Sequence, residues 1–144
     1  MLRNLFAFVS GLFATMIVVT FIAMAHARFV FPPPAGVDLR DTVAANAFIA
    51  SMPPAALALL VMAWVAGAFS GGYASAKLAG SHRTALGLLV GLLVSAGVVH
   101  SAMTVVHPDW VVAAGVGLPP VAAWIAARLA QRAPQDQNGL ASTR

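Results

Sequence analysis

Four long apolar runs constrain the fold of this chain more than any other feature. The first, residues 5–25, lies between Arg3 and the pair His26 and Arg28, and it contains no charged residue. A helix of this length spans the roughly 30 Å hydrocarbon core of a bilayer, because each residue adds about 1.5 Å. Charged residues make up only 8% of the 144 residues, whereas a soluble domain has about 25%. The sequence therefore predicts an all-α bundle of four transmembrane helices.

The limits of the spans follow from where charges and prolines interrupt the apolar sequence. The tripeptide at 25–27 has the form of a signal-peptide cleavage site, but the run before it exceeds the roughly 7–15 apolar residues of a secretory signal, and we expect no cleavage. A single bundle is predicted over 1–130. Its parts are spans at about 5–28, 54–78, 84–106 and 109–130 and an outer loop at 29–53, followed by a disordered cytoplasmic tail at 131–144.

The outer loop begins with a stiff extended segment, because the prolines at 32–34 fix φ and lack an N–H. Asp38 or Asp41 is suited to cap a short helix that runs to about Ser51, since a carboxylate accepts hydrogen bonds at a helix N-terminus and complements its dipole. We expect this short helix to lie at the membrane interface.

Lysines and arginines indicate which ends of the spans share a side of the membrane. With four spans, one side carries Arg3, Lys77, Arg83, Arg128, Arg132 and Arg144, and the other carries Arg28 and Arg40. Loops on the cytoplasmic side of a membrane protein are enriched in these residues. Both termini are therefore predicted to be cytoplasmic.

Small residues recur at matched steps on the second and third spans. Residues four apart share a helix face, and a turn at 80–82 would fold these two faces together. In a bilayer, close backbone approach through small residues is a main source of attraction between helices. We expect the second and third spans to form the tightest pair. The predicted packing residues are Gly67, Gly71, Ser75, Gly87, Gly91 and Ser95, with Ser75 meeting Gly87, Gly71 meeting Gly91 and Gly67 meeting Ser95.

Polar residues recur near the outer ends of the spans. His26 ends the first span, His107 ends the third with Asp109 just after it, and His100 lies about two turns deeper on the same face as His107. These groups could bind a divalent metal or a haem, or they could simply mark the water interface. Because ionisable groups inside spans are rare, we expect His100 to face the bundle interior. Its candidate partners are Thr104, Asn46 and Thr20.

Two consecutive prolines interrupt the fourth span. Pro119 and Pro120 leave the carbonyls of Gly115 and Val116 without their usual N–H donors and are expected to bend the helix. We predict a hinge formed by Gly115, Gly117, Pro119 and Pro120. Broken helices at mid-membrane can form the binding sites of transporters, and they can equally be static kinks.

Three segments together resemble a family of small four-helix bacterial inner-membrane proteins that has no established function. They are PPPAGVDL at 32–39, AGAFSGGY at 66–73 and HPDW at 107–110. The resemblance covers nearly the whole chain and implies a location in the bacterial inner membrane. The number of spans also invites comparison with the small multidrug resistance transporters, which rely on a glutamate in the first helix. Residues 5–25 contain no acid, so that comparison fails at its functional residue.

The residue types argue against several classes of chemistry. There is no cysteine, which excludes thiol catalysis and cysteine-ligated metals. There is no glutamate, and no serine has an obvious base and orienting acid near it. The basic residues flank spans and do not form a nucleic-acid patch. We therefore expect a protein that is not an enzyme, holds no cofactor and does not bind nucleic acid.

The function favoured by the sequence is that of an accessory or scaffold subunit, or of a homo-oligomer, acting in the lipid bilayer through helix–helix contacts. Its partner would be another membrane protein or a second copy of the chain. Two alternatives stay open. One is a small-solute or ion permease built around the interrupted fourth span, and the other is a haem- or metal-binding protein using the outer histidines.

Overall fold

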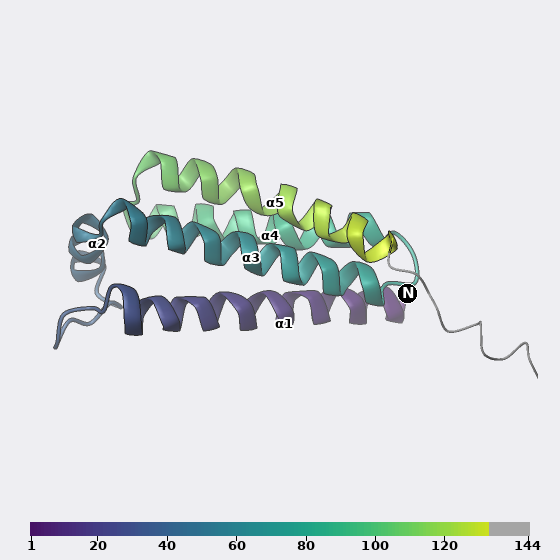
Figure 1. Cartoon of the computed structure of the whole chain (residues 1–144), viewed down its shortest axis with the longest axis horizontal. Coiled ribbons are helices and arrows are strands. Elements are labelled where there is room, and N and C mark those ends of the chain that lie inside the picture. Colours follow the sequence, from purple (N-terminus) through teal and green to yellow (C-terminus); the bar gives the residue numbers. More distant parts are fainter. Residues whose placement is uncertain (133–144) are drawn as a thin grey trace, which may run out of the picture.

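The computed structural model describes residues 1–132, and its regular elements are all helices (Figure 1). Within those residues there is no strand. The elements in chain order are α1 (Leu2–Ala25), the short π-helix η1 (His26–Val30) that continues it, α2 (Thr42–Ser51), α3 (Pro54–Leu78), α4 (Arg83–Thr104) and α5 (Asp109–Arg132).

Four helices are long and apolar enough to cross a membrane, namely α1 joined with η1, α3, α4 and α5, with lengths of 29, 25, 22 and 24 residues. This confirms the prediction of an all-helical chain with four candidate spans. The first helix begins at Leu2, earlier than expected, and the last one includes Gln131 and Arg132, which the sequence assigned to the disordered tail. The rest of that tail, 133–144, lies outside the described residues.

Helix α2 begins where a carboxylate caps it. Asp41 accepts hydrogen bonds from the backbone N–H groups of Val43 and Ala44, both at 3.3 Å. Asp38 instead accepts from the Arg40 N–H at 2.9 Å and so stabilises the turn before the helix. Of the two caps that the sequence left open, the structure has Asp41, because only its side chain can reach the N–H groups of the first helical turn.

Helix α3 lies at the centre of the bundle. It packs most extensively against α5 and α1, and α5 also packs closely against α4 (Figure 1). The contact between α3 and α4 is smaller, and α1 and α4 barely meet. The prediction that the second and third spans form the tightest pair is therefore wrong.

The small-residue face of α3 packs against α1. A Cβ atom built on Gly71 would overlap Thr15 Oγ1 and would lie 2.5 Å from the carbonyl oxygen of Gly11. Gly67 similarly faces Thr15 and Val19 of α1. Ala7, Gly11 and Thr15 are the buried residues of α1, and they too are four residues apart. The close backbone approach expected of this face therefore occurs, but with a different partner helix.

The small-residue face of α4 packs against α5. A Cβ atom on Gly91 would lie 2.8 Å from the carbonyl oxygen of Pro119 and 2.8 Å from the Cα atom of Pro120. One on Gly87 would lie 2.7 Å from the Cβ atom of Ala127. The predicted pairings of Gly71 with Gly91, Ser75 with Gly87 and Gly67 with Ser95 are therefore not those of the structure.

The α3–α5 contact uses a glycine beside the predicted stripe. A Cβ atom on Gly72 would lie 2.8 Å from the Cα atom of Ala123. Ala123 is fully buried and also lies against Gly91, so α3, α4 and α5 converge on this one methyl group. Helix α3 thus presents small residues on two faces, one toward α1 and one toward α5.

Helix α2 lies at the end of the bundle away from the N-terminus (Figure 1). The Oδ1 atom of Asn46 accepts a hydrogen bond of 2.7 Å from the Val106 N–H, which ties α2 to the connection between α4 and α5. The rings of Phe31 and Phe48 lie 5.4 Å apart and fix the extended loop against the same helix. Because of these contacts, the loop and α2 cover one end of the bundle.

Candidate functional site

The predicted polar cluster does not assemble. Among residues 1–132, no three His, Asp or Glu side chains lie close enough together to hold a metal ion. His100 is exposed, and Asp109 is exposed at the start of α5. His107 lies against Trp64, with ring centroids 6.3 Å apart. His26 has a buried Nε2 atom without a hydrogen-bond partner. Within the described residues, no three of these side chains therefore meet at one site.

The expectation that His100 faces the bundle interior is wrong. Helix α4 turns its buried face toward α5 at Ser95 and Val98. Each helical residue rotates by about 100°, so His100 lies about 200° from Val98 and points outward. Thr104 donates to the backbone carbonyl of His100 and not to its ring, and Asn46 binds the Val106 N–H instead.

Of the two carbonyls that Pro119 and Pro120 leave without a donor, a neighbouring helix satisfies that of Val116. Pro119 and Pro120 lie inside α5, which is one helix from Asp109 to Arg132. The carbonyl of Val116, freed by Pro120, accepts a hydrogen bond of 2.7 Å from the Ser95 hydroxyl. The sequence left open a transporter-like break and a static kink, and the engaged carbonyl of Val116 fits the static kink, in which a neighbouring helix satisfies the freed acceptor.

The two predicted hinge glycines lie in different surroundings. Gly115 is buried, and a Cβ atom there would lie 2.6 Å from the Trp64 ring and 2.9 Å from a methyl group of Val98. Gly117 is exposed, and no atom lies within 4 Å of the position its Cβ would take. The missing side chain at Gly115 therefore leaves room for the Trp64 indole to pack, whereas no other helix lies against the Cβ position of Gly117.

A groove lies between α1 and α4, whose mutual contact is small. It has a volume of about 290 Å³, and Trp64 of α3 lies in its lining between the two helices. Gly97 of α4 is exposed there, with no atom within 4 Å of the position of a Cβ. We call this feature the α1–α4 groove; it is lined by Thr15, Met16, Val19, Thr20, Trp64, Val94, Gly97, Val98 and Ser101.

A second cavity adjoins the groove beneath α2. It has a volume of about 300 Å³ and shares Trp64 and Ser101 with the α1–α4 groove. Phe48 and Ile49 of α2 cover it, and His107 lines it with its Nδ1 atom 2.7 Å from the Val105 carbonyl oxygen. The groove is thus continued toward the end of the bundle that α2 covers.

The opposite end of the bundle is held by the N-terminus. The Oδ1 atom of Asn4 accepts from the N–H groups of Gly80 and Ser81, at 3.0 and 3.2 Å, and its Nδ2 atom donates to the Ser81 hydroxyl at 2.8 Å. These bonds join the start of α1 to the α3–α4 turn, in which His82 has a left-handed backbone with φ of 53°. The turn is therefore fixed from outside by a residue more than seventy positions away.

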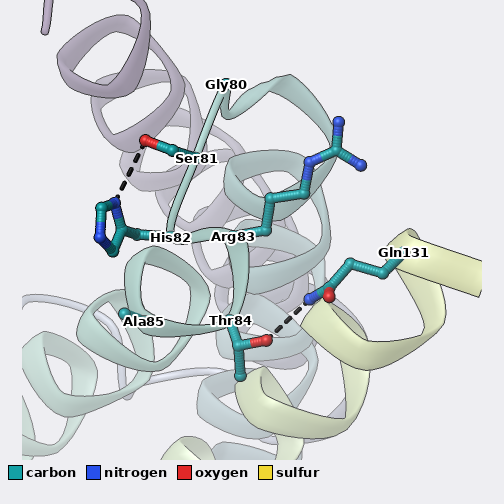
Figure 2. Close-up of a pocket in the computed structure, with 7 residues that line it drawn as sticks. All are labelled: Gly80, Ser81, His82, Arg83, Thr84, Ala85 and Gln131. Carbon is teal, nitrogen blue, oxygen red and sulfur yellow. Dashed lines mark hydrogen bonds between the residues drawn. The ribbon is translucent and has the colours of Figure 1, made fainter.

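A shallow hollow of about 410 Å³ lies beside this turn (Figure 2). Its lining comes from residues 80–85 and from Gln131 of α5, whose side chain donates to the Thr84 hydroxyl at 2.7 Å. Figure 2 shows the Arg83 side chain extended, without a hydrogen bond to the other residues drawn. This end is polar and basic, in contrast to the mainly apolar groove.

Two features of these sites escaped the sequence reasoning. The small residues of α1, Ala7, Gly11 and Thr15, recur at the same four-residue step as those of α3 and could have been found by the same search. Gly97 carried no such signal, because it is two residues from Ser95 and lies off the predicted stripe. Only the arrangement of α1 and α4 shows that the Cβ position of Gly97 is free of neighbouring atoms.

Comparison with known proteins adds no further assignment. A scan against protein-family models finds no match. Searches of curated proteins and of solved structures find no similar protein either. The resemblance to small four-helix inner-membrane proteins therefore stays a prediction, and the groove and the basic end are interpreted from their own chemistry.

Proposed function

We propose that this chain is a multi-pass protein of the bacterial inner membrane that binds a transmembrane helix of a partner protein in the α1–α4 groove. Both termini are cytoplasmic in this proposal, and α2 lies at the outer interface. The protein acts as an accessory or scaffold subunit and not as an enzyme. The observation that carries the proposal is the exposed Gly97, whose Cβ position has no atom within 4 Å, on a helix that α1 leaves largely uncovered.

The lining of the groove suits a helix better than a soluble ligand. Transmembrane helices associate where small residues allow the backbones to approach and where hydroxyl groups can bond across the interface. Gly97 provides the first property, and Thr20 and Ser101 provide hydroxyls on the two walls. A partner helix placed there would cover Gly97 and the Trp64 indole together.

The two alternative functions have less support. A permease at the interrupted fourth span needs free backbone groups at the break, but the Val116 carbonyl is engaged by Ser95 in a continuous α5. A haem or metal site needs the outer histidines to converge, and His100 is directed away from the bundle. No specific observation favours either alternative over a helix-binding role.

Photo-crosslinking tests the proposal directly, because the chain has no cysteine of its own. A benzophenone maleimide attached to Gly97→Cys should crosslink to one protein of defined mass in native membranes. Gly117→Cys is the matched control, since Gly117 is also an exposed glycine with open space at its Cβ position. Equal protein crosslinking at both positions, or none at Gly97→Cys, would contradict the proposal.

A second arm measures the complex itself. Gly97→Leu fills the groove and should lower recovery of a stoichiometric complex in mild detergent by about tenfold or more, whereas Gly117→Leu should leave it unchanged. Light scattering gives the mass of the complex. A crosslinked product of twice the chain mass would show that the partner is a second copy of this chain and not a separate protein.

A further inference from the structure

Five lysine and arginine side chains lie at the end of the bundle that holds the N-terminus. They stand at the start of α1, at the end of α3, at the start of α4 and at the end of α5. Among residues 1–132 the acids are Asp38, Asp41 and Asp109, and all three belong to the opposite end. The described part of this end is therefore purely basic, with Arg3, Lys77, Arg83, Arg128 and Arg132 as its cations.

Two of these arginines are held in place by adjacent carbonyl groups. Arg3 donates from Nε to the carbonyl oxygen of Leu78 at 3.2 Å, and Arg83 donates from Nε to the carbonyl oxygen of Ala79 at 3.2 Å. These carbonyls lie at the C-terminal end of α3, where the helix dipole favours a positive charge. The two guanidinium groups, one from α1 and one from α4, are thus anchored to consecutive residues.

The anchoring leaves the outer part of each guanidinium available. Within residues 1–132, both arginines donate their hydrogen bonds from Nε, and their terminal Nη atoms have no hydrogen-bond partner. The Asn4 bonds to Gly80 and Ser81 hold α1 and the turn together, so the positions of the two arginines are fixed before a ligand arrives. A guanidinium group with free Nη atoms can donate two parallel hydrogen bonds to an oxyanion with several acceptor oxygens.

We propose that Arg3 and Arg83 bind the phosphate group of an anionic phospholipid. The phosphate esters of a bilayer lie at the depth where transmembrane helices end, which is where both arginines stand. The hollow of about 410 Å³ beside Arg83 gives room for a glycerol headgroup next to the phosphate (Figure 2). This site is separate from the α1–α4 groove and does not depend on the helix-binding role.

Thermal unfolding of the full chain in mixed micelles tests the proposal. Phosphatidylglycerol should raise the melting temperature relative to phosphatidylcholine, and the gain should shrink at high salt because the contact is ionic. The double variant Arg3→Gln/Arg83→Gln should bind phosphatidylglycerol about tenfold more weakly or worse. The matched control is Arg28→Gln/Arg40→Gln, which removes the same charge at the opposite end and should keep the parent's response.

A third variant separates binding from folding. Arg3→Lys/Arg83→Lys keeps the charge but loses the planar fork, and it should show intermediate affinity with an unchanged melting temperature in phosphatidylcholine. Three results would each overturn the proposal. The first is an equal rise in melting temperature with both lipids, and the second is an equal loss of phosphatidylglycerol binding in the Arg28→Gln/Arg40→Gln control. The third is a lysine double variant that binds phosphatidylglycerol as tightly as the parent. Inorganic phosphate is the remaining probe, and full displacement of the lipid by millimolar phosphate would assign the site to the free anion instead.

Discussion

Among single residues, Ser95 links side-chain chemistry to the fold most directly. Its hydroxyl donates to the Val116 carbonyl at 2.7 Å, and that carbonyl is the acceptor that Pro120 leaves without an N–H donor. The same hydroxyl lies 3.3 Å from the carbonyl of Gly91 on its own helix. A side chain of α4 thus completes the hydrogen bonding of α5 at the position where Pro120 removes the usual donor.

This contact predicts a specific pattern of coupling. Ser95→Ala should lower the free energy of unfolding in micelles by about 1–2 kcal/mol, because it leaves the Val116 carbonyl without a partner. In a Pro120→Ala background the new N–H can bond that carbonyl, so Ser95→Ala should cost clearly less there. Denaturant unfolding of the four proteins measures the cycle. Equal costs of Ser95→Ala in the two backgrounds would show that the hydroxyl does not substitute for the missing donor.

At the scale of helices, the bundle consists of separate close contacts that share α3 or α5. Gly71 allows α3 to approach α1, and Gly91 allows α4 to approach α5. Gly72 allows the contact between α3 and α5 at Ala123. Each contact depends on the absence of a side chain at one position and is therefore sensitive to added volume there.

Leucine substitutions distinguish this arrangement from a direct pairing of the two glycine stripes. Gly71→Leu and Gly91→Leu should each destabilise the bundle by about 1–3 kcal/mol or more. Gly71 mainly meets α1 and Gly91 meets α5, so most of the two costs should add in the double variant; only the part that passes through Val90 of α4, 2.9 Å from the Cβ position of Gly71, is shared. Thermal unfolding in detergent gives the comparison, with Gly117→Leu as the control that should change little. If the second leucine added almost nothing to the first, the two glycines would share one interface after all.

At the scale of the whole molecule, charge and polarity divide the two ends. One end combines the N-terminus, the α3–α4 turn and the end of α5 with a basic surface (Figure 1). The other end carries α2, the extended loop and the three described acids. Such a division fits a fixed orientation, because basic residues are enriched at the cytoplasmic side.

Accessibility of introduced cysteines checks this orientation in cells. Val37→Cys in the outer loop should react with a membrane-impermeant maleimide added to intact spheroplasts, since its side chain is exposed. Ser81→Cys in the α3–α4 turn should react only after the membrane is permeabilised, and the cysteine-free parent provides the blank. Labelling of Ser81→Cys in intact spheroplasts would reverse or refute the predicted topology.

The sequence predicted the elements well because their causes are local. Long apolar runs produce spans, and Pro120 frees the Val116 carbonyl. The sequence also placed the cap of α2 at Asp38 or Asp41, and the structure has Asp41. Which helix faces meet is a long-range property. Gly71 and Gly72 mark two adjacent small-residue faces on α3, so spacing alone could not assign one of them to α1 and the other to α5.

The candidate sites were harder to predict for a related reason. His100 stands out in the sequence, but its direction depends on which face of α4 packs against α5. The α1–α4 groove exists because these two helices make little contact with each other. A pattern of residues can predict which faces pack together, but it does not predict which helices stay apart. The basic end was visible in the charge distribution, whereas the anchoring of Arg3 and Arg83 to neighbouring carbonyls required the fold.

The attachment of α1 has a consequence for biosynthesis. Helix α1 joins the bundle through one face, and that face packs against α3, which is synthesised only after the loop and α2. Until α3 has been made, α1 has no helix to pack against. The later three helices can associate in turn as successive hairpins. The bonds from Asn4 to the Gly80 and Ser81 N–H groups are thus expected to form only after the α3–α4 turn has been made, although Asn4 is synthesised long before that turn.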